Sequence, residues 1–223
     1  MTDSTAGRWD LYGPVHKGLR RAHALMLMRI GSTDFSADCA PLLADLRRHL
    51  LIAADHLAHE EHFIHPALEA RAPRGTLLLE QQHDHHRQHF LVLTAQIDAI
   101  EAGDRTAIAG RRLSHLFSRF VADDLAHMAE EEEVTFPLLC RHFSDEELQT
   151  IEQAIVADMD PALGGAITES ILAAINIDER VTMLSGLRMG APAEVYRHLF
   201  ETAVRPGLSD PELARLAGLG LAA

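Results

Sequence analysis

The chain has 223 residues, 47% hydrophobic and 24% charged, which is the balance of a globular protein with a buried core and not of a disordered chain. Its 33 acidic residues outnumber its 20 basic ones, and no Lys/Arg cluster includes aromatic residues, so neither nucleic acid nor a membrane surface is an expected partner. The N-terminus has no basic segment followed by an apolar one, and no run of about 18 apolar residues occurs, so we expect a cytoplasmic protein.

Four segments in the front part place apolar residues or histidines at steps of three and four, which is the period of an amphipathic helix. These segments span about residues 12–30, 41–72, 79–102 and 113–138. The connections between them are short, and short connections force neighbouring helices to run in opposite directions. We therefore predict an all-α fold built on an antiparallel four-helix bundle.

Behind His142 the chain changes character. Ser144 and Glu147 have the spacing of a capping box that starts a further helix, and prolines and glycines then divide the rest into short helices. We predict two domains: the bundle in residues 1–143, and an all-α C-terminal extension of about four helices in residues 144–223, in which we identify no chemistry.

Histidine is frequent and unevenly distributed, since 14 of the 15 histidines lie at or before His142. On each of the four helices, the inward stripe is apolar at its ends and carries histidine, or histidine and glutamate, in the middle. Burying such groups without partners costs several kcal/mol each, so they must pair or bind something. Histidine is also the commonest metal ligand, which points to metal or proton chemistry in the front part.

The strongest signal is an internal repeat between the second and fourth helices. Residues 56–68 read HLAHEEHFIHPAL and residues 127–139 read HMAEEEEVTFPLL. In each copy a histidine precedes a glutamate by four residues and a proline by ten. A spacing of four puts both side chains one turn apart on one helix face, so each helix offers one nitrogen and one oxygen ligand. The four candidates are His56, Glu60, His127 and Glu131.

The first and third helices each add a histidine. His16 is the candidate on the first helix, because it lies on the inward stripe. On the third helix His83 and His86 lie on the stripe; we favour His83, since it superposes on His16 by the apolar pattern, and keep His86 as the alternative. His23 faces the core two turns from His16 and is either a hydrogen-bonded core residue or a further ligand.

Other polar residues receive weaker assignments. Tyr12 and Asp124 either orient His16 and His127 or simply pack against their neighbours. The remaining glutamates of the repeat are expected to face solvent or to contact the metal ligands from outside: Glu61, Glu130, Glu132 and Glu133. Most other histidines of the front part fall off the stripes and are expected at the surface: His59, His62, His65, His85, His89, His115 and His142.

The paired HxxxE motifs, each before a proline and each preceded by a lone helical histidine, resemble the hemerythrin HHE cation-binding family over roughly residues 10–142. The resemblance implies a four-helix bundle around two irons, and members of the family bind dioxygen, sense oxygen or iron, or handle peroxide and nitric oxide. It also implies that Glu60 and Glu131 bridge the irons. The implied ligands are His16, His56, Glu60, His83, His127 and Glu131.

The chain departs from the oxygen-carrier pattern of that family. That pattern has an inward HxxxH pair on the third helix and a bridging aspartate after the last histidine, whereas His85 and His89 lie off the stripe and the fourth helix supplies Glu131. Two symmetric HxxxE motifs are more similar to the bacterial and F-box-associated relatives. The resemblance therefore does not predict reversible oxygen transport.

The residue types favour the same metal independently of the resemblance. Mixed imidazole and carboxylate ligands suit iron or manganese, and zinc would bind without redox chemistry. Cys39 and Cys140 are far apart and outside any CxxC spacing, so thiolate ligation is not expected. We predict two Fe ions, with Mn or Zn as substitutes.

The predicted function is that of a non-haem di-iron protein which binds dioxygen or a related diatomic or peroxide ligand, in oxygen, iron or redox sensing or handling. The alternative is a di-iron enzyme that activates dioxygen or removes peroxide or nitric oxide. We expect the C-terminal helices to contact a protein partner or a second copy of the chain. No residue is assigned a catalytic role.

Two other families use overlapping residues. Ferritin-like di-iron proteins carry Glu-x-x-His on two helices, and here only Glu80 and His83 have that spacing with a glutamate. Metal-dependent phosphohydrolases of the His-Asp type use an adjacent pair such as His83 and Asp84. Neither arrangement accounts for the repeat.

Overall fold

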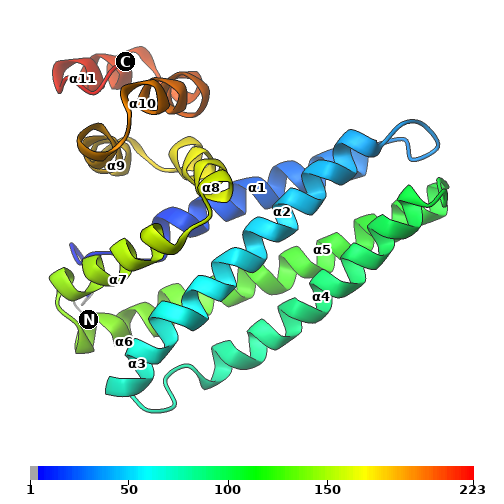
Figure 1. Ribbon diagram of the computed structural model, residues 1–223, viewed down its shortest axis with the longest axis horizontal. Coiled ribbons are helices and arrows are strands. Elements are labelled where there is room, and N and C mark those ends of the chain that lie inside the picture. Colours follow the sequence, from blue (N-terminus) through cyan, green and yellow to red (C-terminus); the bar gives the residue numbers. More distant parts are fainter. Residues whose placement is uncertain (1–4) are drawn as a thin grey trace. The chain divides into compact units, whose positions relative to one another are not determined.

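The computed structural model describes residues 5–223, and the described residues form helices and loops with no strand among them (Figure 1). They divide into two compact units. The first comprises the chain up to Tyr12 together with Ala22–Asp158, and the second comprises Gly13–Arg21 together with Met159–Ala223. The predicted all-α fold is confirmed. Within residues 5–223, every helix is too short or too polar to cross a membrane.

Four rods form the bundle, and short loops between them make neighbouring rods antiparallel (Figure 1). Two of the rods are built from two α-helices each, joined without a break. The rods are α1 (Gly13–Ser32), α2 (Ala40–His59) with α3 (His65–Arg71), α4 (Leu77–Glu101), and α5 (Ala107–Glu130) with α6 (Phe136–His142). The predicted four-helix bundle is therefore confirmed, with α1 contributing to the first unit from Ala22 onward.

The apolar residues of the first unit form two separate clusters. One cluster takes residues from all four rods, among them Met26, Leu46, Ile97 and Phe117. The other includes Ile64, Leu68, Phe136 and Leu139. Along α2 and α5, the residues between the two clusters are the histidines and glutamates of the repeat. The bundle therefore buries a polar layer between two hydrophobic ends, which supply most of the folding free energy.

Each copy of the repeat contains a π turn, at η1 (Glu60–Ile64) and η2 (Glu131–Thr135). In both, the residue after the turn donates its backbone N–H to the carbonyl of the glutamate five residues earlier. The next residue is a proline, Pro66 or Pro137. Proline has no N–H, and its ring would clash with the carbonyl four residues earlier in an α-helix. Widening the helix into a π turn relieves that clash.

A third π turn also precedes a proline. In η3 (Phe200–Val204), Arg205 donates its N–H to the carbonyl of Phe200, and Pro206 follows. This turn has the same spacing to its proline as the two copies of the repeat but carries no histidine. A π turn before a proline thus occurs in this chain without the histidine of the repeat.

The π turns shift the inward face by one residue. The helical period predicts Val134 and Leu138 on the buried stripe, but Val134 is 53% exposed, while Thr135 and Leu139 are buried. In the first copy the same period predicts Phe63 on the buried stripe, but Ile64 is the buried residue. The predicted stripe is wrong beyond each glutamate, because it assumes 3.6 residues per turn where the helix is wider.

Helix α7 (Asp145–Asp158) belongs to the first unit. The guanidinium of Arg8 donates to its first residue with an Nε–Oδ1 distance of 2.6 Å, and the indole of Trp9 donates to Glu152 at 3.1 Å. These hydrogen bonds join α7 to the N-terminal segment of the same unit. The compact units consequently divide after α7 and not before it, where the composition of the chain changes.

The second unit has its own apolar core, which includes Leu172, Leu184, Phe200 and Leu216. Its helices beyond the first unit are α8 (Pro161–Ala174), α9 (Ile177–Gly190), α10 (Ala193–Leu199), η3, the short η4 (Arg205–Gly207) and α11 (Asp210–Gly218). A capping box at Asn176 starts α9. The predicted helical extension is therefore present.

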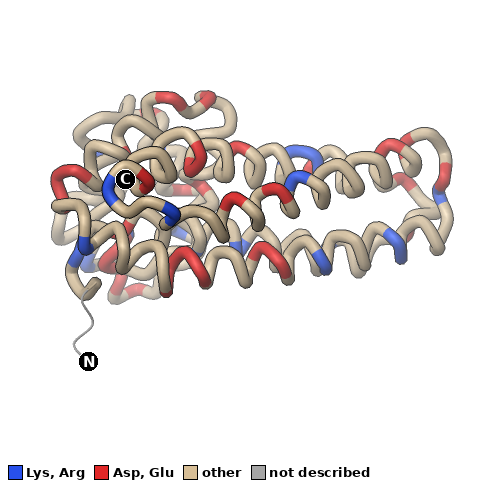
Figure 2. Tube along the Cα trace, turned by 90° about the horizontal axis from the view of Figure 1, so that it is seen from below, with Lys and Arg blue, Asp and Glu red and all other residues tan. Residues whose placement is uncertain are grey.

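The basic residues of the described chain do not form a continuous stretch. Figure 2 shows Lys and Arg scattered along it.

Candidate metal centre

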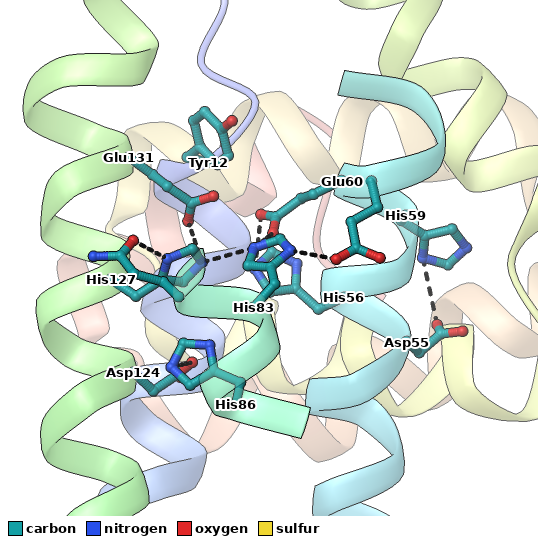
Figure 3. A network of polar contacts seen from close by, with 12 residues as sticks. Tyr12, Asp55, His56, His59, Glu60, His83, His86, Asp124, His127 and Glu131 are labelled. Carbon is teal, nitrogen blue, oxygen red and sulfur yellow. Dashed lines mark hydrogen bonds and ion pairs between the residues drawn. The ribbon is translucent and has the colours of Figure 1, made fainter. Parts of the chain in front are cut away.

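Four buried side chains converge in the polar layer of the bundle: Glu60 from η1, His83 from α4, His127 from α5 and Glu131 from η2. Each offers one ligand atom, and these atoms all lie within 4.8 Å of one another. Figure 3 shows the carboxylate of Glu131 next to the imidazole of His127, and that of Glu60 next to the imidazole of His83. Burial of two nitrogen and two oxygen donors around one point is the arrangement of a metal centre.

The distances connect each histidine to a glutamate and to the other histidine. The Nε2 atoms of His83 and His127 lie 3.2 Å apart. His83 Nε2 is 3.4 Å from Glu60 Oε2, and His127 Nε2 is 3.4 Å from Glu131 Oε2. The two HxxxE motifs therefore meet the third helix at a single cluster.

The other ring nitrogens determine which tautomer faces the cluster. His83 Nδ1 lies 2.9 Å from Glu61 Oε1, and His127 Nδ1 lies 2.9 Å from Gln82 Oε1. Both partners are oxygen acceptors, so in the neutral imidazole the proton belongs on Nδ1 and the lone pair on Nε2. Two lone pairs 3.2 Å apart repel each other unless a cation or a proton lies between them.

Glu60 reaches two histidines with different oxygens. Its Oε1 lies 3.1 Å from His56 Nε2, while its Oε2 faces His83. His56 and Glu60 also lie within 4.8 Å of a carboxylate oxygen of Glu131. The carboxylate of Glu60 therefore lies between His56 and His83 and offers a separate oxygen to each.

Electrostatics favour an ionised Glu60 and a neutral His127, whereas the glutamates around His83 raise its pKa despite burial. Burial alone would raise the pKa of Glu60, but His56 and His83 lower the pKa by more, so the group is a carboxylate at neutral pH. Burial lowers the pKa of His127 to about 3, so its imidazole is neutral. These are the protonation states in which both groups bind a cation.

His16 lies in the first half of α1, in the stretch Gly13–Arg21 that belongs to the second unit. Its role as a ligand stays a prediction from the sequence.

His23 and His86 lie beside the cluster but outside it. His23 Nε2 is 2.6 Å from Asp124 Oδ2, and His23 Nδ1 is 2.9 Å from His49 Nε2. Both ring nitrogens of His23 thus have hydrogen-bonding partners, as expected of a core histidine. His86 Nε2 is 3.6 Å from the other oxygen of Asp124. Neither histidine belongs to the groups of residues that could hold a metal ion.

Asp124 does not orient His127, which is one of the two roles predicted for it. Its carboxylate hydrogen-bonds to His23 on α1, and the residue that contacts His127 Nδ1 is Gln82 on α4. The sequence carries no signal for Gln82, because glutamine one position before His83 reads as an ordinary surface residue of α4.

Tyr12 is fully buried and lies beside Glu131 (Figure 3). Burial raises the pKa of its hydroxyl well above the usual value, and the charges of Glu131 and Glu60 raise it further. The hydroxyl therefore stays protonated at neutral pH and places an O–H group near the carboxylates.

Two histidines that were expected at the surface are buried: His59 and His65. The ring of His65 stacks on that of His83, with 5.0 Å between centroids. His65 follows the π turn directly, so the extra residue in the turn moves it onto the inward face. The surface prediction for His65 is wrong for the same reason as the predicted stripe.

A pocket of about 410 Å³ opens beside the cluster on the side of α3 and α4. It includes Glu61, the partner of His83, and His65, which stacks on His83. Its lining residues are Glu61, His65, Pro66, Glu69, Glu80, Asp84 and Arg87. The pocket brings solvent close to His83.

Comparison with known proteins identifies one family. Residues 74–160 match the family model of the hemerythrin HHE cation binding domain. The matched range contains His83, His127 and Glu131, and it ends just after α7. No curated protein and no solved structure matches the chain. The predicted resemblance to the hemerythrin HHE cation-binding family is therefore confirmed over residues 74–160.

Proposed function

We propose that the cluster holds two iron ions, and that the protein binds dioxygen or a related small ligand there in order to sense or handle oxygen, iron or redox state. The observation that carries the proposal is the position of Glu60, whose two oxygens face His56 and His83. In this proposal Glu60 and Glu131 would hold both irons, His56, His83 and His127 would supply nitrogen ligands, and His16, predicted from the sequence, would complete the set.

The donor set supports iron on chemical grounds. It combines imidazole nitrogens with carboxylates and includes no thiolate, which suits iron or manganese and disfavours calcium and magnesium. The buried carboxylates of Glu60 and Glu131 also offer ligand oxygens within 4.8 Å of each other. A divalent cation between them offsets their repulsion and desolvation. Manganese and zinc remain substitutes in the proposal.

When bound, a pair of irons supplies two one-electron carriers beside each other. The chain's own residues would control access and protons. The pocket beside His83 would admit a small ligand, and apolar residues on both sides of the polar layer would limit water.

The second candidate is an enzyme that consumes peroxide or nitric oxide, or activates dioxygen. Rapid breakdown of an oxygen-derived ligand requires a nearby proton donor. Tyr12 is buried beside Glu131, and burial raises the pKa of its hydroxyl well above the usual value in the metal-free protein. Its O–H group is the proton donor that this candidate would use.

The location and partners of the protein remain proposals. We place it in the cytoplasm, and we assign the second unit a contact with a partner protein or a second copy. Three of its apolar side chains are exposed and support such a contact: Met189, Val195 and Leu219.

The proposal is tested by loading the metal-free protein anaerobically with ferrous iron, exposing it to oxygen and recording its absorption spectrum. A new absorption band that disappears when oxygen is removed supports binding. Sustained consumption of added peroxide or nitric oxide supports the enzyme instead. Two results together contradict both candidate functions. Protein purified from iron-replete cells would contain no iron above trace, and the His127→Ala variant would have the same iron content as the wild type.

A further inference from the structure

A second group of metal-binding residues lies outside the buried cluster. His85 and His89 are one turn apart on α4, and Asp123 lies on the neighbouring α5. Each offers a ligand atom, and these atoms lie within 4.8 Å of one another. This is the HxxxH pair that falls off the inward stripe, so the central site makes no use of it.

The geometry directs both histidines to one carboxylate oxygen. His89 Nε2 lies 2.7 Å from Asp123 Oδ2, and His85 Nε2 lies 4.0 Å from the same atom. The two rings stack with 4.8 Å between centroids and 14° between planes. Both imidazoles therefore present the same nitrogen to the same side of the helix.

The three side chains differ in how freely they can rotate. His89 is only 13% exposed and its ring contacts Phe120, so its position is fixed by packing. His85 is 63% exposed and Asp123 is 43% exposed, so these two can rotate to complete a coordination sphere. A fixed ligand with two adjustable ones needs little reorganisation to close on an ion.

We propose that His85, His89 and Asp123 form a separate surface site for a single divalent transition-metal ion, with zinc as the favoured ion. Two imidazoles and one carboxylate are ligands that zinc accepts, and water would fill the remaining position. Imidazole sites hold zinc more tightly than ferrous iron by the usual order of affinities. An exposed histidine–aspartate pair contributes little by itself, so a bound ion would add stability by joining α4 to α5.

The proposal is independent of the iron pair, because it uses none of its ligands. Its test is a titration of metal-free protein with zinc chloride, with zinc counted by equilibrium dialysis and the melting temperature recorded. The variants are H85Q/H89Q and Asp123→Asn. His115→Gln, an exposed histidine on α5, is the matched control, and Glu131→Gln disables the central site.

We expect H85Q/H89Q to bind one zinc fewer per chain than the wild type, and Asp123→Asn to bind that zinc at least tenfold more weakly. The zinc-induced rise in melting temperature should be smaller in H85Q/H89Q than in His115→Gln. Glu131→Gln should keep this zinc even where it loses central metal. An H85Q/H89Q protein that binds as many zinc ions as the wild type, with the same affinity, would overturn the proposal.

Discussion

The Nε2 atoms of His83 and His127 lie 3.2 Å apart, with the carboxylates of Glu60 and Glu131 within 3.4 Å of one nitrogen each. Their Nδ1 atoms meet oxygen acceptors, so two neutral rings would face each other with lone pairs on Nε2. Burial lowers the pKa of His83, but Glu60, Glu61 and Glu131 raise it above its usual value, so a proton on His83 relieves this contact in the metal-free protein. Two carboxylates are buried in the same layer, so metal binding and the stability of the metal-free fold oppose each other here.

Neutralising one carboxylate should stabilise the metal-free protein and weaken metal binding. For Glu131→Gln we expect the free energy of unfolding without metal to rise by about 1 to 3 kcal/mol, since repulsion from Glu60 is removed. Urea unfolding in the presence of a chelator measures it. The control is Glu133→Gln, an exposed glutamate in the same π turn. A less stable Glu131→Gln protein would show that the carboxylate stabilises the fold without metal.

Gln82 should matter for metal affinity although it lies outside the ligand set. Its Oε1 is 2.9 Å from His127 Nδ1 and fixes the tautomer and ring orientation. Loss of such a partner costs roughly 10- to 100-fold in affinity. We expect this weakening in Gln82→Ala, measured by competition with a chelator, while Gln81→Ala, an exposed neighbour, should bind like the wild type. Equal affinities in the two variants would rule out the orienting role.

The shifted face after the second π turn can be tested by truncation. Leu139 is fully buried, so Leu139→Ala should cost about 2 to 5 kcal/mol of unfolding free energy. Val134 is 53% exposed, so Val134→Ala should change it by less than about 0.5 kcal/mol. Chemical denaturation of both variants measures these losses and shows which of the two residues faces the core after the π turn. A larger loss in Val134→Ala than in Leu139→Ala would restore the unbroken α-helical stripe.

His49 makes the metal-free protein sensitive to acid. Burial lowers its pKa to about 3, well below the usual value of 6.5, so the folded state favours the neutral ring. This contribution to stability is complete above pH 6.5 and declines as the pH falls toward 3. Between pH 6.5 and 5 the loss from His49 is about 2 kcal/mol.

The His49→Gln variant should therefore lose less stability than the wild type over that interval, in urea unfolding with chelator at both pH values. His115→Gln, which changes an exposed histidine, should lose as much as the wild type. The same loss in all three proteins would mean that His49 has the same pKa in the folded and unfolded states.

The bundle and the core of its site were predictable because they depend on local periodicity. Spacing of four brings His127 and Glu131 to one face whether or not the rest of the fold is known. Pairing with Glu60 and His83 follows from the antiparallel bundle that short loops impose. The division of the chain was less predictable, because α7 belongs to the first unit through hydrogen bonds from Arg8 and Trp9, far away in sequence.

His65 and Gln82 escape prediction from the sequence for different physical reasons. His65 was expected at the surface because a helical stripe drawn with 3.6 residues per turn ignores the π turn imposed by Pro66. The prolines were visible in the sequence, and treating each as the end of a π turn would have moved His65 inward. Gln82 had no such signal, since its role depends on where α5 places His127.

Counting iron in the reconstituted protein tests the central claim most directly. Metal-free wild type, Glu60→Ala and the control Glu133→Ala should be loaded anaerobically with ferrous iron, desalted and analysed for metal. The account predicts two irons per chain in the wild type and the control, and less than half of that in Glu60→Ala, because Glu60 faces both His56 and His83. Trace iron in all three proteins, or equal iron in Glu60→Ala and the wild type, would contradict it.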